Sequence, residues 1–512
     1  MTPALRFLSA AITTASPDEA SGSLFIAGVF LNGGKPRLTP SAAAFDETRG
    51  GALTRMIECG AFDAKAGSTL FLGETEAFPN GFAVLGLGEE KDFSRKVFAE
   101  CAAKAARAFA WAESQAYAVQ EWLPPKTSGK SSARLFSTAV LNALTPRFTL
   151  KTEHDDGIRT KRIFWIDDLV TDKLVQGLDE GVVTAEAMSI SRGLADLPGN
   201  VCTPAYLAEA VQNAAASMTT VEVEVLDEHQ IEELGMGAFL SVAKGSTVPP
   251  RFIAIRYRGT NAALPPVAFV GKGITFDTGG ISLKPAANMA DMTYDMSGAA
   301  VVIGTVMAAA RAKLPVNLLG VVAACENLPS GSAAKPSDVV TSLSGKTIEI
   351  LNTDCEGRMI LADALTWTAR QKPELIIDAA TLTGACCVAL GAPYSGLFTS
   401  DDALAYDLIK AGRDSLDDVW RLPVGAEYAK LMKTPAADIA NQATVRDGGA
   451  SSAAAFLSVF AEDVRWAHLD IAATANTSGR DRHSTGRPCR CSCASFSRRC
   501  ADRRTSGASH RP

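Results

Sequence analysis

The sequence predicts an α/β protein with a smaller N-terminal α/β domain and a larger C-terminal α/β domain, the latter with a mixed, largely parallel sheet covered by helices. The chain has 512 residues, which is too long for one ordinary hydrophobic core. Hydrophobic residues make up 47% of it and charged residues 21%, the balance of a globular protein. Short β-rich runs alternate with helical runs along most of the chain, and this alternation is typical of sheets covered by helices.

The N-terminal part contains several β-rich runs but no group of polar side chains that indicates chemistry. Its alanine-rich run at 96–118 has helical spacing and predicts a helix. The polar run at 124–134 predicts a surface loop. Strands are expected at 23–30, 68–73, 81–88 and 162–168.

The C-terminal part begins after a helix predicted over 171–195, and Thr203-Pro204 is a favourable start for the next helix. A further helix is expected over 298–313. Strands are expected at 221–227, 251–259, 266–273, 316–324 and 375–380. These runs predict an N-terminal domain over 1–170, a linker helix over 171–195, a catalytic domain over 196–488 and an atypical basic, cysteine-rich tail over 489–512.

Charge and cysteine content exclude some function classes. The formal net charge is −6, but the segment from Arg480 onward carries nine Arg and two Asp, so the preceding 479 residues carry −13. A body that acidic argues against binding to a nucleic-acid backbone. The 11 cysteines include no CxxC pair and are expected to be reduced thiols of a cytoplasmic protein. No run of 18 apolar residues predicts a membrane span, and the N-terminus is expected to lead into a first strand rather than to be a secretory signal.

Charged side chains gather around a glycine-rich loop that follows a hydrophobic strand. Lys272 lies at the end of this strand, and Asp277 and Lys284 follow in the loop. Loops at the carboxyl ends of strands are where α/β sheets place their sites. Taken alone, the loop is explained equally well as a tight turn with solvated charges.

Two further segments supply acidic residues. Asp295 precedes an apolar helical run, so it is favoured as a helix cap when considered alone. Asp354, Glu356 and Arg358 alternate before a helical pattern that begins at Met359. In an extended segment all three side chains would point to one side, which is costly unless ions lie between them.

Together these segments supply four carboxylates (Asp277, Asp295, Asp354 and Glu356) and three cationic side chains (Lys272, Lys284 and Arg358), while all five histidines lie outside them. A metal site built without histidine suits hard or borderline divalent cations. Four carboxylates can hold two such ions about 3.5–4 Å apart, as in two-metal hydrolases. Lys272 could join them only as a neutral amine, which adjacent dications would favour by lowering its pKa.

Three motifs in this region resemble those of a known family. The sequence NTDCEGR at 352–358 resembles the NTDAEGR signature of the leucyl aminopeptidase (cytosol aminopeptidase) family of two-metal peptidases. GKGITFDTGGISLKP at 271–285 and YDMSGAA at 294–300 resemble that family's other metal-binding blocks, in the same order. The resemblance spans 23–488, weakly in the N-terminal domain, for which it implies a macro-like α/β fold, and strongly after Asn200.

The resemblance implies a role for each motif residue. Lys284 would polarise the scissile carbonyl, and Arg358 would hold a bicarbonate ion that acts as general base towards the attacking water. Met292 and Asn352 would contribute to the substrate pocket, and Leu382 would offer its backbone carbonyl to the tetrahedral intermediate. One metal would be bound tightly by Lys272, Asp277, Asp295 and Glu356, and a more exchangeable one by Asp277, Asp354 and Glu356.

The family also implies a function and an assembly. The enzyme would be a metallo-aminopeptidase that uses two Mn²⁺ or Zn²⁺ ions per subunit to release N-terminal leucine and other apolar residues from peptides. The free α-amine of the substrate would lie near Asp295, so an acylated N-terminus should be refused. A cytoplasmic homohexamer is expected, with no membrane or nucleic-acid partner.

Two features depart from the family pattern. Cys355 stands where the family usually has alanine, and a small buried residue is favoured there over a reactive thiol. After Pro488 the family continues with an apolar segment, whereas this chain continues with CRCSC. A DNA sequence that encodes CRCSC can encode VPLLV in a shifted frame, so we hypothesise that a frameshift replaced the C-terminus and left a disordered tail. Resequencing the locus tests this hypothesis.

Two other functions compete with the peptidase. A nucleotide-binding loop at 270–280 is disfavoured because Lys272 has no Walker spacing and no Ser or Thr directly after it. A non-catalytic, DNA-binding member of the same family is disfavoured by the acidic body of the chain. Metal binding by the tail cysteines and nucleic-acid binding by the tail arginines are both ranked below a disordered tail.

Overall fold

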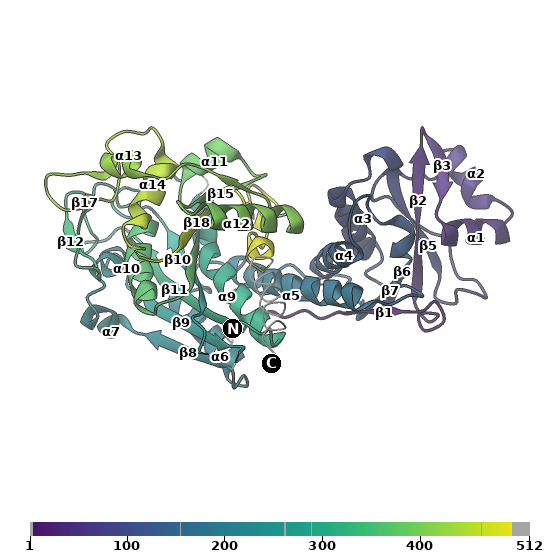
Figure 1. The fold of residues 1–512 in the computed structure, drawn as a ribbon, viewed down its shortest axis with the longest axis horizontal. Helices are drawn as coiled ribbons and strands as arrows, with labels where there is room; N and C mark the ends of the chain where they lie inside the picture. The colour runs from purple at the N-terminus through teal and green to yellow at the C-terminus, as the bar shows by residue number, and fades with distance from the viewer. Residues whose placement is uncertain (1–3, 154, 261–262, 288, 462, 494–512) are drawn as a thin grey trace, which may run out of the picture. The chain divides into compact units, whose positions relative to one another are not determined.

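The computed structural model describes residues 4–153, 155–260, 263–287, 289–461 and 463–493. The chain forms two compact units (Figure 1). One unit comprises Phe7–Glu186, and the other comprises Met1–Arg6 together with Ala187–Pro512. The helix α5 (Asp172–Ala195) contributes residues to both units. The α/β class expected from the sequence is confirmed in each unit.

The smaller unit is built on a seven-stranded sheet. Its strands follow the order β1-β7-β6-β2-β5-β4, and β3 pairs with β2. The strand bounds are β1 Ala11–Ala15, β2 Leu24–Asn32, β3 Lys35–Leu38, β4 Thr69–Phe71, β5 Phe82–Glu89, β6 Ser114–Tyr117 and β7 Arg162–Ile166. The helices are α1 Pro40–Thr48, α2 Ala52–Glu58, α3 Arg95–Ala108 and α4 Gly129–Ala143, with short 3-10 turns η1 Glu90–Asp92 and η2 Val119–Trp122.

Two predictions in this unit are wrong. The polar run at 124–134 is a loop only up to Ser128, because α4 begins at Gly129 and buries Ser132 and Ala133. The expected helix over 96–118 ends at Ala108, and β6 begins at Ser114. All four residues of β6 are buried, and β6 pairs with β2 on one side and β7 on the other. A central strand is therefore formed by residues whose alanine-rich context favours a helix, because tertiary pairing overrides local propensity.

The larger unit contains an eight-stranded mixed sheet with the order β16-β15-β18-β14-β10-β11-β9-β8. The strands β18, β14, β10 and β11 run parallel to one another. At the two sides of this group, β15 is antiparallel to β18, β9 is antiparallel to β11, and β8 is antiparallel to β9. Their bounds are β8 Val221–Leu226, β9 Arg251–Arg258, β10 Val267–Asp277, β11 Asn317–Asn327, β14 Leu375–Ala380, β15 Ser395–Phe398, β16 Val419–Arg421 and β18 Trp466–Asp470. Short strands β12 Val339–Thr341, β13 Thr347–Glu349 and β17 Ile439–Ala440 form a second sheet, and β19 Asn476–Thr477 pairs with β20 His483–Ser484.

Helices cover both faces of the central strands (Figure 1). The helix α9 (Ser297–Arg311) lies on one face and α10 (Glu356–Arg370) on the other. A Cβ on Gly271 would lie 2.6 Å from the carbonyl oxygen of Gly298 at the start of α9, so close packing requires glycine there. The other helices are α6 Pro204–Ala215, α7 Glu228–Glu233, α8 Gly237–Ala243, α11 Gly384–Leu390, α12 Asp402–Ser415, α13 Ala426–Ala429 and α14 Gly449–Ser458, with η3 Met289–Met296 and η4 Lys430–Met432.

The apolar run at 289–311 is a core element. Met289–Arg311 is long and apolar enough to cross a membrane by length and composition alone. Of its most apolar 18-residue window, 89% lies buried inside the fold, which is typical of a core helix.

The first residues of the tail differ from the expectation of disorder. Residues 489–493 form a helical turn inside the larger unit, where Cys489, Cys491 and Cys493 are buried. The backbone N–H of Cys491 donates to Asp417 at 3.2 Å. The expected disorder is therefore wrong for 489–493, and the rest of the tail, Cys500 included, lies outside the described residues.

Candidate active site

A cavity of about 530 Å³ opens at the carboxyl ends of β10 and β14 in the larger unit. It brings together every site residue expected from the sequence: Lys272, Asp277, Lys284, Met292, Asp295, Asn352, Asp354, Glu356, Arg358 and Leu382. None of the described histidines lines this cavity. The expectation that these segments meet at the ends of parallel strands is thus fulfilled, and the site has the histidine-free composition that the sequence indicates.

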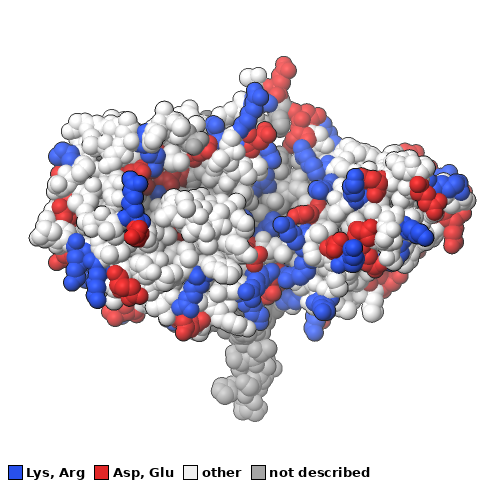
Figure 2. Space-filling view, turned by 90° about the horizontal axis from the view of Figure 1, so that it is seen from above, with Lys and Arg blue, Asp and Glu red and all other residues white. Residues whose placement is uncertain are grey.

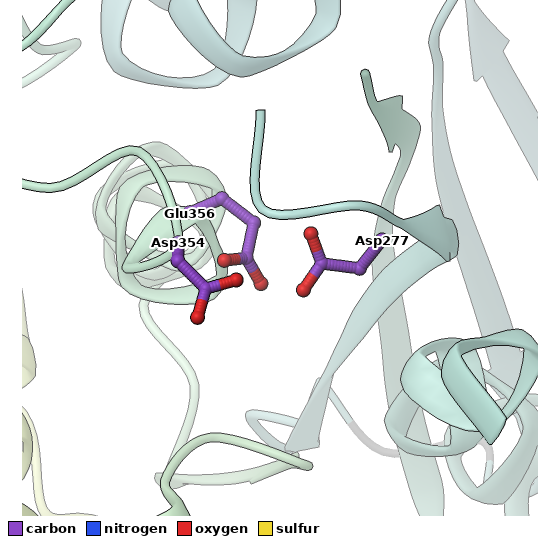
Figure 3. Close-up of side chains that lie close together, drawn as sticks. All are labelled: Asp277, Asp354 and Glu356. Atoms are coloured by element: carbon purple, nitrogen blue, oxygen red, sulfur yellow. The ribbon is translucent and has the colours of Figure 1, made fainter. Parts of the chain in front are cut away.

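Three carboxylates converge at the centre of the cavity (Figure 3). One oxygen from each of Asp277, Asp354 and Glu356 lies within 4.8 Å of the other two. Asp277 is the last residue of β10, Asp354 lies in a turn and Glu356 begins α10. Like charges held this close in a buried site repel one another, and cations between them would offset the repulsion.

Lys272 is buried in the site and pairs with Asp295 and with Glu356. Its Nζ lies 2.8 Å from Asp295 Oδ2 and 2.7 Å from Glu356 Oε1, and it donates to the backbone carbonyl of Thr381 at 2.9 Å. A Cβ on Gly357 would lie 2.7 Å from the Cε of Lys272, so only glycine leaves room for this side chain at the start of α10.

Lys284 enters the cavity from the loop after β10. Its Nζ lies 2.8 Å from Asp277 Oδ2 and also pairs with Asp354 Oδ1. The side chain keeps 21% of its surface exposed, whereas that of Lys272 keeps 4%. Lys284 is therefore the ammonium group that a bound substrate can reach.

Burial and mutual repulsion shift the pKa of the buried acids upward. Burial, together with neighbouring Asp277, raises the pKa of Glu356 to about 8. Burial raises the pKa of Asp295 to about 6 against the opposing effect of Lys272. Burial alone would lower the pKa of Lys272, but Asp295 and Glu356 outweigh it and raise that pKa. Two lysines therefore do not fully neutralise the four carboxylates.

The donor set fits divalent cations. Glu356 is 2% exposed, and its Oε2 has no hydrogen-bond partner among the described residues. A buried carboxylate oxygen without a partner is costly, and a cation would satisfy it. Oxygen ligands from three or four acids suit hard or borderline divalent ions.

Arg358 lies beside the acids on the first turn of α10. It is 6% exposed and donates through Nη1 to the backbone carbonyl of Asn441 at 2.6 Å. Its Nε is buried and has no hydrogen-bond partner among the described residues. Arg358 lines the cavity, and a guanidinium group with an unpartnered nitrogen is a donor available to an anion.

The structure rejects the helix-cap explanation that Asp295 had when considered alone, and it corrects the local structure expected around Asp354. Asp295 does not cap α9, because Met296 holds the cap position and Asp295 accepts instead from the hydroxyl of Thr381 at 2.6 Å. The segment from Asp354 to Arg358 is not extended, because α10 begins at Glu356 rather than at Met359. Glu356 and Arg358 therefore reach the cavity from a helix and not from alternate positions of a strand.

Two asparagines that the sequence analysis did not single out hold the loops that carry the acids of the site. Asn441 accepts from the backbone N–H groups of Leu351 and Asn352 at 2.8 and 3.2 Å and donates to the carbonyl of Asn352 at 2.7 Å. Asn327 donates to Asp277 and to the carbonyl of Thr353. The strand expected at 316–324 stopped short of Asn327, which ends β11, and the nearness of Asn327 to Asp277 follows only from strand pairing. Asparagine is common at such ends for local reasons.

Leu382 and Met292 complete the lining. The backbone N–H of Leu382 donates to the buried carboxylate of Asp470 at 3.3 Å, which fixes the loop after β14. Met292 lies in η3, and Asn352 accepts through its side-chain oxygen from the N–H of Asp354 at 2.8 Å. Cys355 is partly buried, and burial raises the pKa of its thiol.

Comparisons with known proteins identify the family of the chain. The model of the cytosol aminopeptidase family, catalytic domain, matches residues 189–492, and that of the family's N-terminal domain matches 26–148. A protein of Azoarcus sp. (strain BH72) described as a probable cytosol aminopeptidase is 44% identical over 484 residues, which cover 93% of this chain and 96% of that protein.

Solved structures give the same result. A mutant of tomato leucine aminopeptidase has a TM-score of 0.83 and 30% identity, and the match covers 97% of this chain and 98% of that one. The bottromycin maturation enzyme BotP in complex with Mn has a TM-score of 0.79 and 29% identity, with 94% and 100% covered. The chain therefore belongs to the cytosol aminopeptidase family and is a peptidase.

Proposed function

We propose that this enzyme is a two-metal aminopeptidase that releases leucine and other apolar residues from the N-termini of peptides. The observation that carries the proposal is the convergence of Asp277, Asp354 and Glu356 on one point of the cavity, with the Lys272–Asp295 pair beside them. Family membership supports aminopeptidase activity. The number of ions and the residue preference are our inferences from the site.

The residues fit two divalent ions. Lys272, Asp277, Asp295 and Glu356 would hold one ion, and Asp277, Asp354 and Glu356 the other, as the family resemblance implies. Manganese is supported by the BotP structure, which is a complex with Mn. When bound, such ions supply Lewis acidity and activate water for attack on a carbonyl.

The protein's own groups would then act on the substrate. Lys284 has the exposure and position to donate to the oxygen of the scissile carbonyl as negative charge develops there. Arg358 offers its unpartnered Nε to a bicarbonate ion, which would accept a proton from the attacking water. The apolar lining contributed by Met292, Leu382 and Ala385 favours an apolar first side chain.

The resemblance also leads us to propose a homohexamer in the cytoplasm. Basic and acidic side chains are interspersed on the face shown in Figure 2, which disfavours a nucleic-acid partner on that face. Sedimentation analysis of the purified protein tests the assembly, and a monomer at micromolar concentration would contradict it.

Hydrolysis of leucine p-nitroanilide tests the proposed activity. We expect release of p-nitroaniline with added Mn²⁺, loss of this activity with chelator and recovery when Mn²⁺ is restored. The matched substrate N-acetyl-leucine p-nitroanilide should not be hydrolysed, because it has no free amine. Equal hydrolysis of both substrates, or activity that chelator leaves unchanged, would contradict the proposal.

A further inference from the structure

Asn327 bridges two loops that carry the acids of the site. It is the last residue of β11, directly beside Asp277 at the end of β10. Its side chain is buried, with 4% of the residue exposed. The amide Nδ2 donates to Asp277 Oδ1 at 2.7 Å and to the backbone carbonyl of Thr353 at 3.0 Å. One amide group therefore contacts both the loop after β10 and the loop before α10.

The contact with Asp277 determines which of its oxygens is available. Asp277 Oδ1 accepts from Asn327 and also from the backbone N–H of Gly279 at 2.8 Å. Its Oδ2 makes neither contact and lies 2.8 Å from Nζ of Lys284 inside the cavity. Two donors on Oδ1 thus hold the carboxylate in the rotamer that presents Oδ2 to the other acids.

The contact with Thr353 fixes the second loop at the same point. Thr353 precedes Asp354, and its hydroxyl donates to the carbonyl of Gly279 at 2.6 Å. The backbone N–H of Ser282 donates back to that hydroxyl at 2.8 Å. The backbone carbonyl of Asn327 also accepts from the N–H of Thr278 at 2.9 Å. Asn327 therefore sets the separation of Asp277 and Asp354 through both its side chain and its backbone.

We propose that Asn327 is a positioning residue that sets the affinity of the site for divalent cations. This inference rests on the proposed function, because it assumes that Asp277 and Asp354 share cations. Groups that orient a ligand through hydrogen bonds typically change metal affinity about 10- to 100-fold when they are removed. Asn327 touches neither substrate nor the reacting atoms in this scheme and acts only through Asp277 and the Thr353 backbone.

Asn327→Asp separates this role from simple space filling. Aspartate has nearly the same size, but when ionised it has no hydrogen to donate to Asp277 or to Thr353. An added negative charge alone would strengthen cation binding, so weaker binding would have to come from the lost donors. We expect the Kd for Mn²⁺ of the chelator-treated full-length protein to rise at least about 10-fold, measured by electron paramagnetic resonance of free Mn²⁺. A Kd that is unchanged or lower would overturn the inference.

Two further variants keep the test independent of folding. Asn327→Ser removes the amide without adding charge, and we expect it to raise the Kd for Mn²⁺ as well. Asn317→Asp is the matched control, because Asn317 begins the same strand and contacts Thr260 and Leu264 instead of the acids. Its Kd should equal that of the unmodified protein. Thermal unfolding in chelator shows which variants are folded, and an unchanged Kd in either folded Asn327 variant would overturn the inference.

The same titration distinguishes the two proposals. If the unmodified protein binds no Mn²⁺, the proposed function fails and the inference fails with it. If the unmodified protein binds Mn²⁺ and either folded Asn327 variant binds it equally well, only the role of Asn327 is refuted.

Discussion

Asp354 is the carboxylate of the central cluster that is easiest to remove without disturbing the fold. Its side chain is 33% exposed, whereas that of Asp277 is 2% exposed. Asp354 lies in a turn and is not part of a strand or helix. We expect Asp354→Ala to abolish turnover of leucine p-nitroanilide, since one of the proposed ions would lose a ligand.

The control for this prediction is Asp402→Ala, which removes an aspartate that is 89% exposed and pairs with Arg421. This variant should keep the activity of the unmodified protein. Near-normal turnover by Asp354→Ala at saturating Mn²⁺ would contradict the assignment of Asp354 as a ligand.

Cys355 tests whether the family's usual alanine is needed between the two acids. Burial raises the pKa of its thiol, so the group stays protonated at neutral pH and is a poor nucleophile. We therefore expect the kcat of Cys355→Ala to stay within about twofold of that of the unmodified protein. A loss of even 1 kcal/mol of transition-state stabilisation would lower kcat about fivefold. The measurement is kcat on leucine p-nitroanilide, and a loss of about 100-fold would show that the thiol takes part in the reaction.

At the residue level, long motifs predicted the site better than single residues did. The loop after β10 and Asp295 each had a structural explanation when taken alone, and only their combination with the segment around Asp354 indicated a metal site. Asn327 and Asn441 escaped because their partners are distant in sequence and their own neighbours are ordinary. Hydrogen bonds between distant segments leave no periodic pattern in a sequence.

At the level of elements, strands and long helices were predicted well, but ends and short strands were not. The strand β10 continues to Asp277, four residues beyond the predicted end, because it pairs with β11 up to Asn327. The helix α10 starts at Glu356 although Cys355 offers no side-chain cap. Gly357 packs against Lys272, and α10 is buried from Glu356 to Thr368; neither feature is visible in local propensity.

The helix α10 also carries a buried aspartate outside the cavity. Asp363 is fully buried and accepts from the backbone N–H groups of Phe239 at 2.8 Å and Leu343 at 2.7 Å. Burial nevertheless raises its pKa to about 7. This carboxyl therefore joins α10 to α8 and to the loop after β12, and its proton contributes to the pH dependence of stability.

The sign of this effect follows from the two states of the chain. An aspartate in the unfolded chain has a pKa of about 3.9. Between about pH 4 and pH 7, Asp363 therefore keeps its proton in the folded chain and loses it in the unfolded chain. The free energy of unfolding contributed by Asp363 should fall as the pH rises through this range, by at most about 1.4 kcal/mol per pH unit. It is fully present below about pH 4 and lost above about pH 7.

Asp363→Asn removes this titration. We expect the Tm of the unmodified protein minus that of the variant to decrease between pH 5.5 and pH 7.5, measured in chelator by differential scanning calorimetry. Asp438→Asn is the control, because Asp438 accepts from Thr347 and these bonds lower its pKa. Its Tm difference should stay constant over the same range. A constant difference for Asp363→Asn would show that this carboxyl does not titrate there.

At the scale of the whole molecule, the chemistry is confined to one unit. The cavity is lined by residues of the larger unit alone, at the carboxyl ends of parallel strands. The sequence predicted this confinement, because every charged residue of the three motifs lies between Lys272 and Arg358. The sequence did not predict that residues 489–493 pack into the larger unit, because the residues after Pro488 match no periodic pattern.

The end of the larger unit is therefore where sequence and structure differ most, and deletion tests it. Cys489 and Cys491 are fully buried, and the Cys491 N–H satisfies a carboxylate of Asp417 that is itself fully buried. A chain ending at Pro488 would lose these contacts and leave Asp417 with fewer donors. We estimate a loss on the order of 2–4 kcal/mol from buried apolar surface and one hydrogen bond to a charged group.

This loss should lower Tm by about 3–6 °C, since 1 kcal/mol corresponds to about 1.5 °C for a unit of this size. The matched control is a chain that ends at Cys493, which keeps every described contact of the tail. Comparing the two truncated proteins by calorimetry in chelator isolates residues 489–493, so equal Tm values would show that this turn does not stabilise the unit. A lower Tm for the shorter protein with the same affinity for Mn²⁺ in its folded state would place the effect on the fold and not on the metal site. The turn at 489–493 contacts α5, α12 and Asp417 after α12, and none of these partners lines the cavity, so this separation of stability from metal binding is the expected result.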